Sequence, residues 1–218
     1  MRWVSARGRR LRFGGRIAGV GTTSGVRVVV GRWTDTPAPA FAGAPFADAM
    51  VETAAGHRVL LAPNQAVVDL LTATYNFDET RIEPFRVEET PTGWEVRSTS
   101  LTLDVGFGRR SGLGRLLNVE PTRLATSPAW CTLTDPVARL VMRGVRTRGT
   151  AGHGRREWYG ATDAHHILSV TGSFDGEPLG DLAPVDPPTR FGFSAPPRRP
   201  TVTTVVTTIE ESDPAPRP

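Results

Sequence analysis

Alternation of apolar and polar positions is the clearest pattern in this chain, and it predicts β-strands. Between residues 101 and 107, every second side chain is large and apolar, and the intervening ones are Thr, Asp and Gly. A segment with this period places one face against a core and the other toward solvent. Similar segments, bounded by turns rich in Gly, Pro and Asn, predict hairpins at 10–33, 47–62 and 81–107 and strands at 144–159, 164–174 and 201–209.

Two short helices are expected between these strands. Asn64 is a good N-cap, and the stripe of Val67, Leu70 and Leu71 predicts a helix that runs to about residue 75 and covers a sheet. The dipeptide Asp135-Pro136 is typical of a cap and first helical residue, and it predicts about two turns that end before Gly144. Residues 111–134 are expected to be irregular.

Together these elements predict an all-β, mainly antiparallel fold with two short helices. Many short strands without a βαβ rhythm favour a sheet closed or nearly closed into a calycin-like β-barrel, with a β-sandwich as the alternative. We expect one domain over residues 1–211, followed by a disordered C-terminal tail at 212–218.

The charge of the chain is carried by arginine and lies in blocks. All 26 basic residues are Arg, which excludes Schiff-base, Walker-lysine and Ser-Lys chemistry. Residues 1–34 hold eight Arg and no acid, whereas residues 35–104 hold eleven acids and four Arg. Opposite blocks can pair within one fold, so a nucleic-acid partner is not expected. Abundant Arg, Ala, Gly and Pro with no Lys are typical of a high-GC bacterial genome.

Cys131 is the single cysteine, so the fold contains no internal disulfide and a cytoplasmic protein is expected. Beside Trp130 and Leu133 it is predicted to be a small buried hydrophobe rather than a nucleophile. No apolar run approaches the roughly 18 residues of a membrane span, so no membrane association is expected. Self-association into a homo-oligomer is left open.

A glycine-rich segment at 19–25 resembles a dinucleotide-binding loop, which requires a helix after it. The β-branched run 26–30 follows instead, and this favours a hairpin turn. The four histidines are too scattered for a zinc signature. We therefore expect no cofactor and no metal.

The richest chemistry lies in residues 155–166. In a strand that begins near Ala164, Asp163 and His165 share one face and can form a carboxylate–imidazole pair, with Tyr159 as a third catalytic candidate. The same alternation also fits an ordinary solvated exterior. Which of the two holds depends on whether His165 points into or out of the barrel.

Three functional hypotheses follow. The first is a soluble module that binds a small, partly apolar and anionic molecule inside the barrel. The second is a cofactor-independent hydrolase, isomerase or hydratase that uses Asp163, His165 and Tyr159. The third is a protein whose charge blocks mediate interactions with other proteins. The candidate ligand-binding residues of the first hypothesis are the aromatic wall residues Trp94, Phe107, Trp158 and Tyr159 and the anion-binding residues Arg155 and Arg156.

Overall fold

The structure is a computed structural model that describes residues 10–37, 41, 43–141, 144–150 and 155–210. The tail expected at 212–218 lies outside these residues. The first half of the chain forms β1 (Arg10–Thr22), β2 (Arg27–Asp35), β3 (Phe46–Glu52), β4 (Arg58–Ala62), α1 (Gln65–Thr72), β5 (Glu79–Ile82), β6 (Arg86–Thr90), β7 (Gly93–Arg97) and β8 (Leu101–Arg110). The second half forms α2 (Gly112–Leu117), α3 (Thr122–Ala125), α4 (Pro128–Val141), β9 (Arg148–Thr150), β10 (Arg156–Phe174), β11 (Glu177–Pro178), β12 (Leu182–Ala183) and β13 (Thr201–Glu210).

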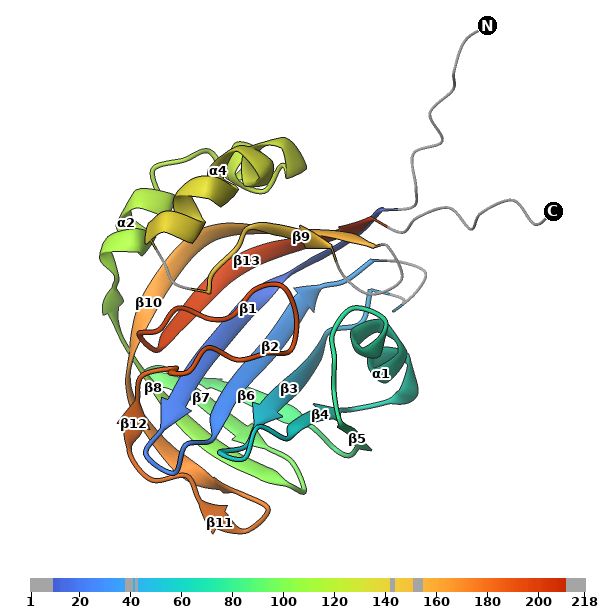
Figure 1. Cartoon of the computed structure of the whole chain (residues 1–218), viewed down its shortest axis with the longest axis vertical. Helices are drawn as coiled ribbons and strands as arrows, with labels where there is room; N and C mark the ends of the chain where they lie inside the picture. The colour runs from blue at the N-terminus through green and yellow to red at the C-terminus, as the bar shows by residue number, and fades with distance from the viewer. Residues whose placement is uncertain (1–9, 38–40, 42, 142–143, 151–154, 211–218) are drawn as a thin grey trace, which may run out of the picture.

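The strands belong to one strongly curled sheet that forms a half-barrel (Figure 1). Its main path runs β5-β4-β3-β2-β1-β13-β10-β8-β7-β6. Neighbours are antiparallel except β4 and β5, which are parallel and joined through α1. The all-β, mainly antiparallel prediction is confirmed. The sheet is open rather than closed, since no ladder joins the end strands β5 and β6 within the described part of the chain.

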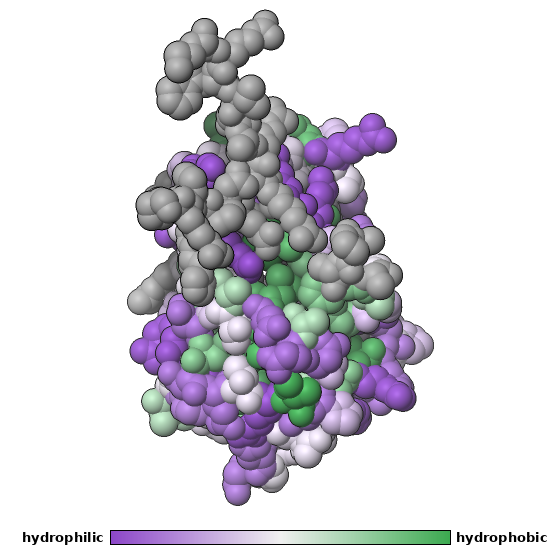
Figure 2. All heavy atoms as spheres, turned by 90° about the vertical axis from the view of Figure 1, so that its right-hand side faces the viewer, coloured by the Kyte–Doolittle hydropathy of each residue, from purple (hydrophilic) through white to green (hydrophobic). Residues whose placement is uncertain are grey.

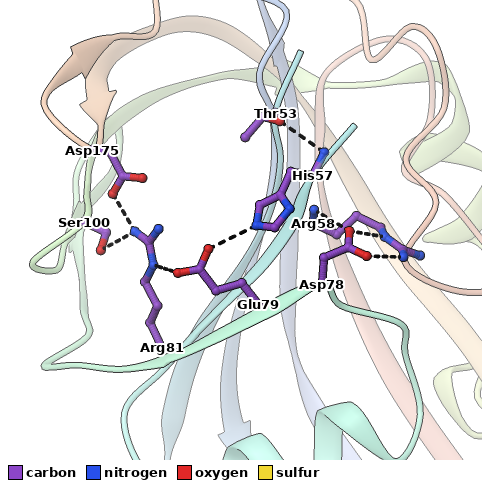
Figure 3. A network of polar contacts seen from close by, with 8 residues as sticks. All are labelled: Thr53, His57, Arg58, Asp78, Glu79, Arg81, Ser100 and Asp175. Atoms are coloured by element: carbon purple, nitrogen blue, oxygen red, sulfur yellow. Dashed lines mark hydrogen bonds and ion pairs between the residues drawn. The ribbon is translucent and has the colours of Figure 1, made fainter. Parts of the chain in front are cut away.

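Side chains, rather than a ladder, tie the edge strand β5 to the turns across the curl (Figure 3). Arg81 donates to Glu79 on its own strand, to Ser100 Oγ at 3.0 Å and to Asp175 Oδ1 at 2.5 Å. Ser100 lies in the turn between β7 and β8, and Asp175 in the turn after β10. Buried Glu83 also accepts from the backbone N–H of Ser100 at 3.1 Å. This network connects the β5 edge to the opposite side of the half-barrel without a β-ladder.

The concave face of the curl holds the main core. Apolar side chains converge there from β1 to β4 and from β7, β8, β10 and β13, and the alternation read at 101–107 is confirmed because Leu101, Leu103 and Val105 are all buried in this core. Its other buried members are Ala18, Val20, Val28, Val30, Ala49, Val51, Val59, Leu61, Trp94, Val96, Ile167, Val170, Phe174, Leu179 and Val202.

The convex face carries a second apolar layer, so the central strands are covered on both sides. Helix α1 buries Val67, Val68 and Leu71 against β4, and Asn64 Oδ1 accepts from Val67 N at 3.1 Å as its N-cap. The helix predicted from residue 64 is thus confirmed.

On the side that carries α1, β4 and β5, Figure 2 shows mostly hydrophilic residues below and a hydrophobic stretch beside the grey atoms. Charged side chains on an exposed edge strand oppose pairing with other chains.

The expectation of two helices was wrong, because four are present in the described residues. Residues 111–134 are not irregular: they hold α2, α3 and the start of α4, and Pro136 lies inside α4 rather than at its beginning. Helix α4 begins after Ser127 instead. The Ser127 Oγ accepts a hydrogen bond from Trp130 N at 3.2 Å, and Pro128 is the first helical residue. Asp135 accepts hydrogen bonds from the backbone N–H groups of Thr147 and Arg148, so its carboxylate stabilises the segment that follows α4.

The three helices α2, α3 and α4, residues 112–141, form what we call the helical cap, which lies along β10 at one end of the curl (Figure 1). A Cβ on Gly160 would lie 2.5 Å from Thr126 Cα, so glycine at this position allows the cap to approach the strand closely. Trp158 Nε1 donates to Thr132 Oγ1 of α4 at 3.2 Å. No helix in the described part of the chain is long and apolar enough to cross a membrane.

Candidate functional site: a polar band on the concave face

The strand register places a row of polar residues on the concave face. Arg16 of β1 pairs with Arg32 of β2 and with Thr204 of β13, and Thr204 pairs with Asp163 of β10. Directly opposed residues of antiparallel strands point to the same face. In the adjoining row, His165 pairs with Val202, which is part of the concave core. Asp163 and His165 therefore point into the curl.

Asp163 and His165 form one end of this band together with Arg110. The Arg110 guanidinium donates two hydrogen bonds to the Asp163 carboxylate, Nε to Oδ1 at 2.9 Å and Nη2 to Oδ2 at 3.0 Å. Partial burial is the largest single influence and acts to raise the pKa of Asp163. The hydrogen bonds from Arg110 and from the Ala164 backbone N–H, together with the charges of His165 and Arg110, outweigh it, so the pKa is lowered. His165 Nε2 lies 3.3 Å from Asp163 Oδ2, and Nδ1 lies 3.2 Å from the Gly108 carbonyl oxygen. Both ring nitrogens thus already face oxygen acceptors.

Arg16 forms the other end of the band, above two aromatic rings. Its guanidinium carbon lies 5.5 Å from the centre of the Trp94 ring and 5.1 Å from that of Phe107. The two rings meet edge to face, with centroids 5.5 Å apart. Arg16 Nη1 donates to Glu89 Oε1 at 3.1 Å, and Arg32 lies 3.5 Å from the same oxygen. Trp94 and Phe107, both predicted to be wall residues, lie together on the concave side.

The exposed fraction differs strongly among the residues of the band. The Trp94 residue is only 1% exposed, whereas the side chains of Arg16 and His165 are 31% and 34% exposed. The buried Trp94 ring and the partly buried Phe107 ring therefore form an aromatic floor, and the charged side chains reach water above it. A cationic group over an aromatic face gains electrostatic stabilisation from the ring quadrupole, and more when it is partly desolvated.

The remaining predicted site residues lie elsewhere. Trp158 is buried beneath the helical cap, and Arg156 pairs with Glu210 at 3.1 Å near the end of β13. Arg155 immediately precedes β10. Tyr159 belongs to the convex apolar layer, where its ring stacks on Phe193 at 5.3 Å. The structure does not bring these four residues to the band.

Tyr159 instead belongs to a buried polar cluster with Tyr75 and Glu157. The two tyrosine hydroxyls are 2.5 Å apart, and Tyr75 donates to Glu157 Oε1 at 2.8 Å. Burial raises the pKa of Glu157 to about 7, although hydrogen bonds from both tyrosines oppose the shift. Burial also raises the pKa values of both tyrosines, with the Glu157 charge adding to the effect. This cluster packs β10 against the residues that follow α1.

Four members of the band were not among the predicted site residues: Arg16, Arg32, Arg110 and Glu89. The chain does contain a partial signal, since Arg16 alternates in phase with the buried Ala18 and Val20 of the same strand. That signal places a cation on the core-facing side of β1, but only the register of β1 with β13 and of β13 with β10 brings it into line with Asp163. Among the described residues, no group of three His, Cys, Asp or Glu side chains is placed to hold a metal ion.

Comparison with known proteins adds little to this geometry. No family model matches the chain, and no curated protein matches it. Among solved structures, the chain is similar to an AttH, provisionally so named, from Nitrosomonas europaea, with 14% identity and a TM-score of 0.28. The match covers 100% of this chain and 57% of the length of the other. A likeness of this strength supports no argument about fold or function.

Proposed function

We propose that this protein is a binding module that holds a small, partly apolar anion on the polar band of the concave face. The observation that supports this most directly is the Arg16 guanidinium, held over Trp94 and Phe107 and still partly open to water. An apolar ligand body would lie against the aromatic floor, and its anionic group would meet the guanidinium. Binding sites of this kind combine apolar walls with a few well-placed polar groups. We place such a module in the cytoplasm on the basis of its single cysteine.

The local charge balance favours an anion. Arg12 points to the same face of β1 as Arg16, and its guanidinium donates to the uncharged Thr126 hydroxyl at 3.3 Å. The ion pair between Arg16 and Glu89 is partly exposed, and pairs of this kind contribute little free energy, so a ligand carboxylate or phosphate can compete for the arginine. The arginines around the band are Arg12, Arg16, Arg32 and Arg110, and the acids are Asp35, Glu89 and Asp163.

The hydrolase, isomerase or hydratase hypothesis remains the alternative. It requires His165 or Asp163 to accept a proton from a substrate. In the observed arrangement both nitrogens of His165 contact oxygen acceptors, and Arg110 occupies both oxygens of Asp163. Tyr159 lies in the convex layer and does not join them. Because these hydrogen-bonding atoms are already occupied, the contacts favour a role of Asp163 and His165 in orienting a bound molecule over general base catalysis.

The test uses anilinonaphthalene sulfonate, an aromatic anion, as a fluorescent probe whose binding is also measured by calorimetry. Arg16→Gln should weaken probe binding about tenfold or more, because a charge-assisted hydrogen bond is lost. Arg198→Gln is the matched control, since Arg198 makes a 3.1 Å ion pair with Asp186 in an exposed loop. Equal affinities for Arg16→Gln and Arg198→Gln, or no binding by the native protein, would refute the proposal. A decanoate ion that displaces the probe better than decanol does would support an anionic ligand.

A further inference from the structure

Exposed apolar side chains are concentrated on the helical cap. Within the described residues, six large hydrophobic side chains are exposed, and four of them belong to the cap or its connecting turns. Val119 is 83% exposed and Leu116 is 66% exposed, so most of the surface of each residue is in contact with solvent. The four residues are Leu116, Val119, Leu124 and Leu133.

Helix α4 shows that this exposure follows the helical period. Its inner side buries Cys131 and Ala138. Its outer side exposes Ala129, Leu133 and Pro136, at spacings of four and three residues. Residues at these spacings lie on one face of a helix. The side of α4 that faces away from the sheet is therefore an apolar stripe.

The same region also holds arginines without acidic partners. Arg109, Arg115 and Arg123 are exposed and make no side-chain hydrogen bond or ion pair with any residue that the structure describes. Elsewhere in the described part of the chain, most arginine side chains are in ion pairs, such as Arg58 with Asp78 and Arg97 with Asp104. The carboxylate of Glu120, between α2 and α3, accepts from Trp130 Nε1 at 2.8 Å. The surface of the cap thus combines free cationic groups with exposed apolar ones.

We propose that the helical cap docks onto an anionic membrane surface. Guanidinium groups at such a surface meet lipid phosphates, and the Leu and Val side chains enter the boundary of the acyl chains. The apolar groups project from three helices and a connecting turn, and a fluid lipid layer accommodates them without a matching shape. A polyanion such as heparin would meet the arginines but leave the apolar side chains in water. The docking is peripheral and is independent of the ligand proposed for the concave face.

The experiment measures co-sedimentation of the full chain with two kinds of vesicle, one of phosphatidylcholine alone and one that also contains phosphatidylglycerol. The native protein should bind the mixed vesicles, and added salt should weaken this binding. Arg115→Gln with Arg123→Gln should lower the partition coefficient about 25-fold, about fivefold for each charge. Leu116→Ser with Leu133→Ser should lower it about tenfold or more.

Matched controls separate the cap from general surface effects. Ile82→Ser removes an exposed apolar side chain from β5, and Arg198→Gln removes an exposed cation from the loop before β13. Both controls should bind vesicles as the native protein does. The proposal would be overturned by absent binding, by equal binding to the two vesicles, or by cap variants that match the controls. It would also be overturned by heparin retention as strong as vesicle binding, or by self-association that Leu116→Ser and Leu133→Ser abolish.

Discussion

Glu157 should make the stability of this fold depend on pH, and Glu157→Gln should remove that dependence. The residue is fully buried, and its carboxylate accepts a hydrogen bond from the Tyr75 hydroxyl at 2.8 Å. Burial disfavours the charged carboxylate and raises its pKa from 4.5 to about 7. The native state therefore binds this proton more tightly than the unfolded state does. The free energy of unfolding consequently falls as the pH rises from about 4.5 to about 7, and it levels off above that range.

The expected size follows from the shift. A difference of about 2.5 pKa units corresponds to about 3 kcal/mol of unfolding free energy, because one unit is worth about 1.4 kcal/mol. Burial also raises the pKa of Asp48 to about 7, so the native protein and the variant both retain the contribution of Asp48. Relative to the native protein, Glu157→Gln should thus be about 2.5 kcal/mol more stable at about pH 8 than at about pH 5, where the unfolded carboxyl group is already largely ionised.

Urea denaturation of both proteins across this pH range measures the effect. The new amide nitrogen replaces an oxygen that has no partner in the described part of the chain, and this imposes a cost that does not change with pH. Comparing the two pH values cancels that cost. Glu177→Gln, at an exposed position in β11, serves as the control and should follow the native curve. A Glu157→Gln curve parallel to the native one would refute the assignment of this titration to Glu157.

Two further predictions concern packing. Leu71→Ala should cost about 2 to 5 kcal/mol in urea denaturation, because Leu71 of α1 is buried against β4, whereas Leu116→Ala should change stability by less than about 0.5 kcal/mol. Similar losses for both would contradict the packing of α1. Cys131 is 2% exposed and burial raises its thiol pKa to about 11, so it should react slowly with a thiol reagent at neutral pH, and Cys131→Ala should cost on the order of 1 kcal/mol. Rapid labelling of the native protein would show the thiol to be accessible.

Local rules explain most of what the sequence predicted correctly. Alternation at 101–107 identified β8, because residues two apart on a strand share a face whatever lies opposite them. Asn64 and the apolar stripe after it identified α1, because capping and helical period act within a few residues. Gly25, at φ +84°, ends the turn between β1 and β2, so the glycine-rich segment is a hairpin, as predicted. The pairing of Asp163 with His165 is local in the same sense.

The tertiary structure decided everything that depends on which strands are neighbours. Residues 111–134 lack a strong pattern of their own, and their helices pack on β10 through contacts such as Gly160 with Thr126. The sequence allowed Asp163 and His165 to face either way, and the register with Val202 set them toward the concave core. Arg16 lies 147 positions before Asp163 in the chain, yet the two share one row because β13 pairs with both β1 and β10. No periodicity within a single strand encodes such a row, because strand order and register are set by the packing of the whole sheet.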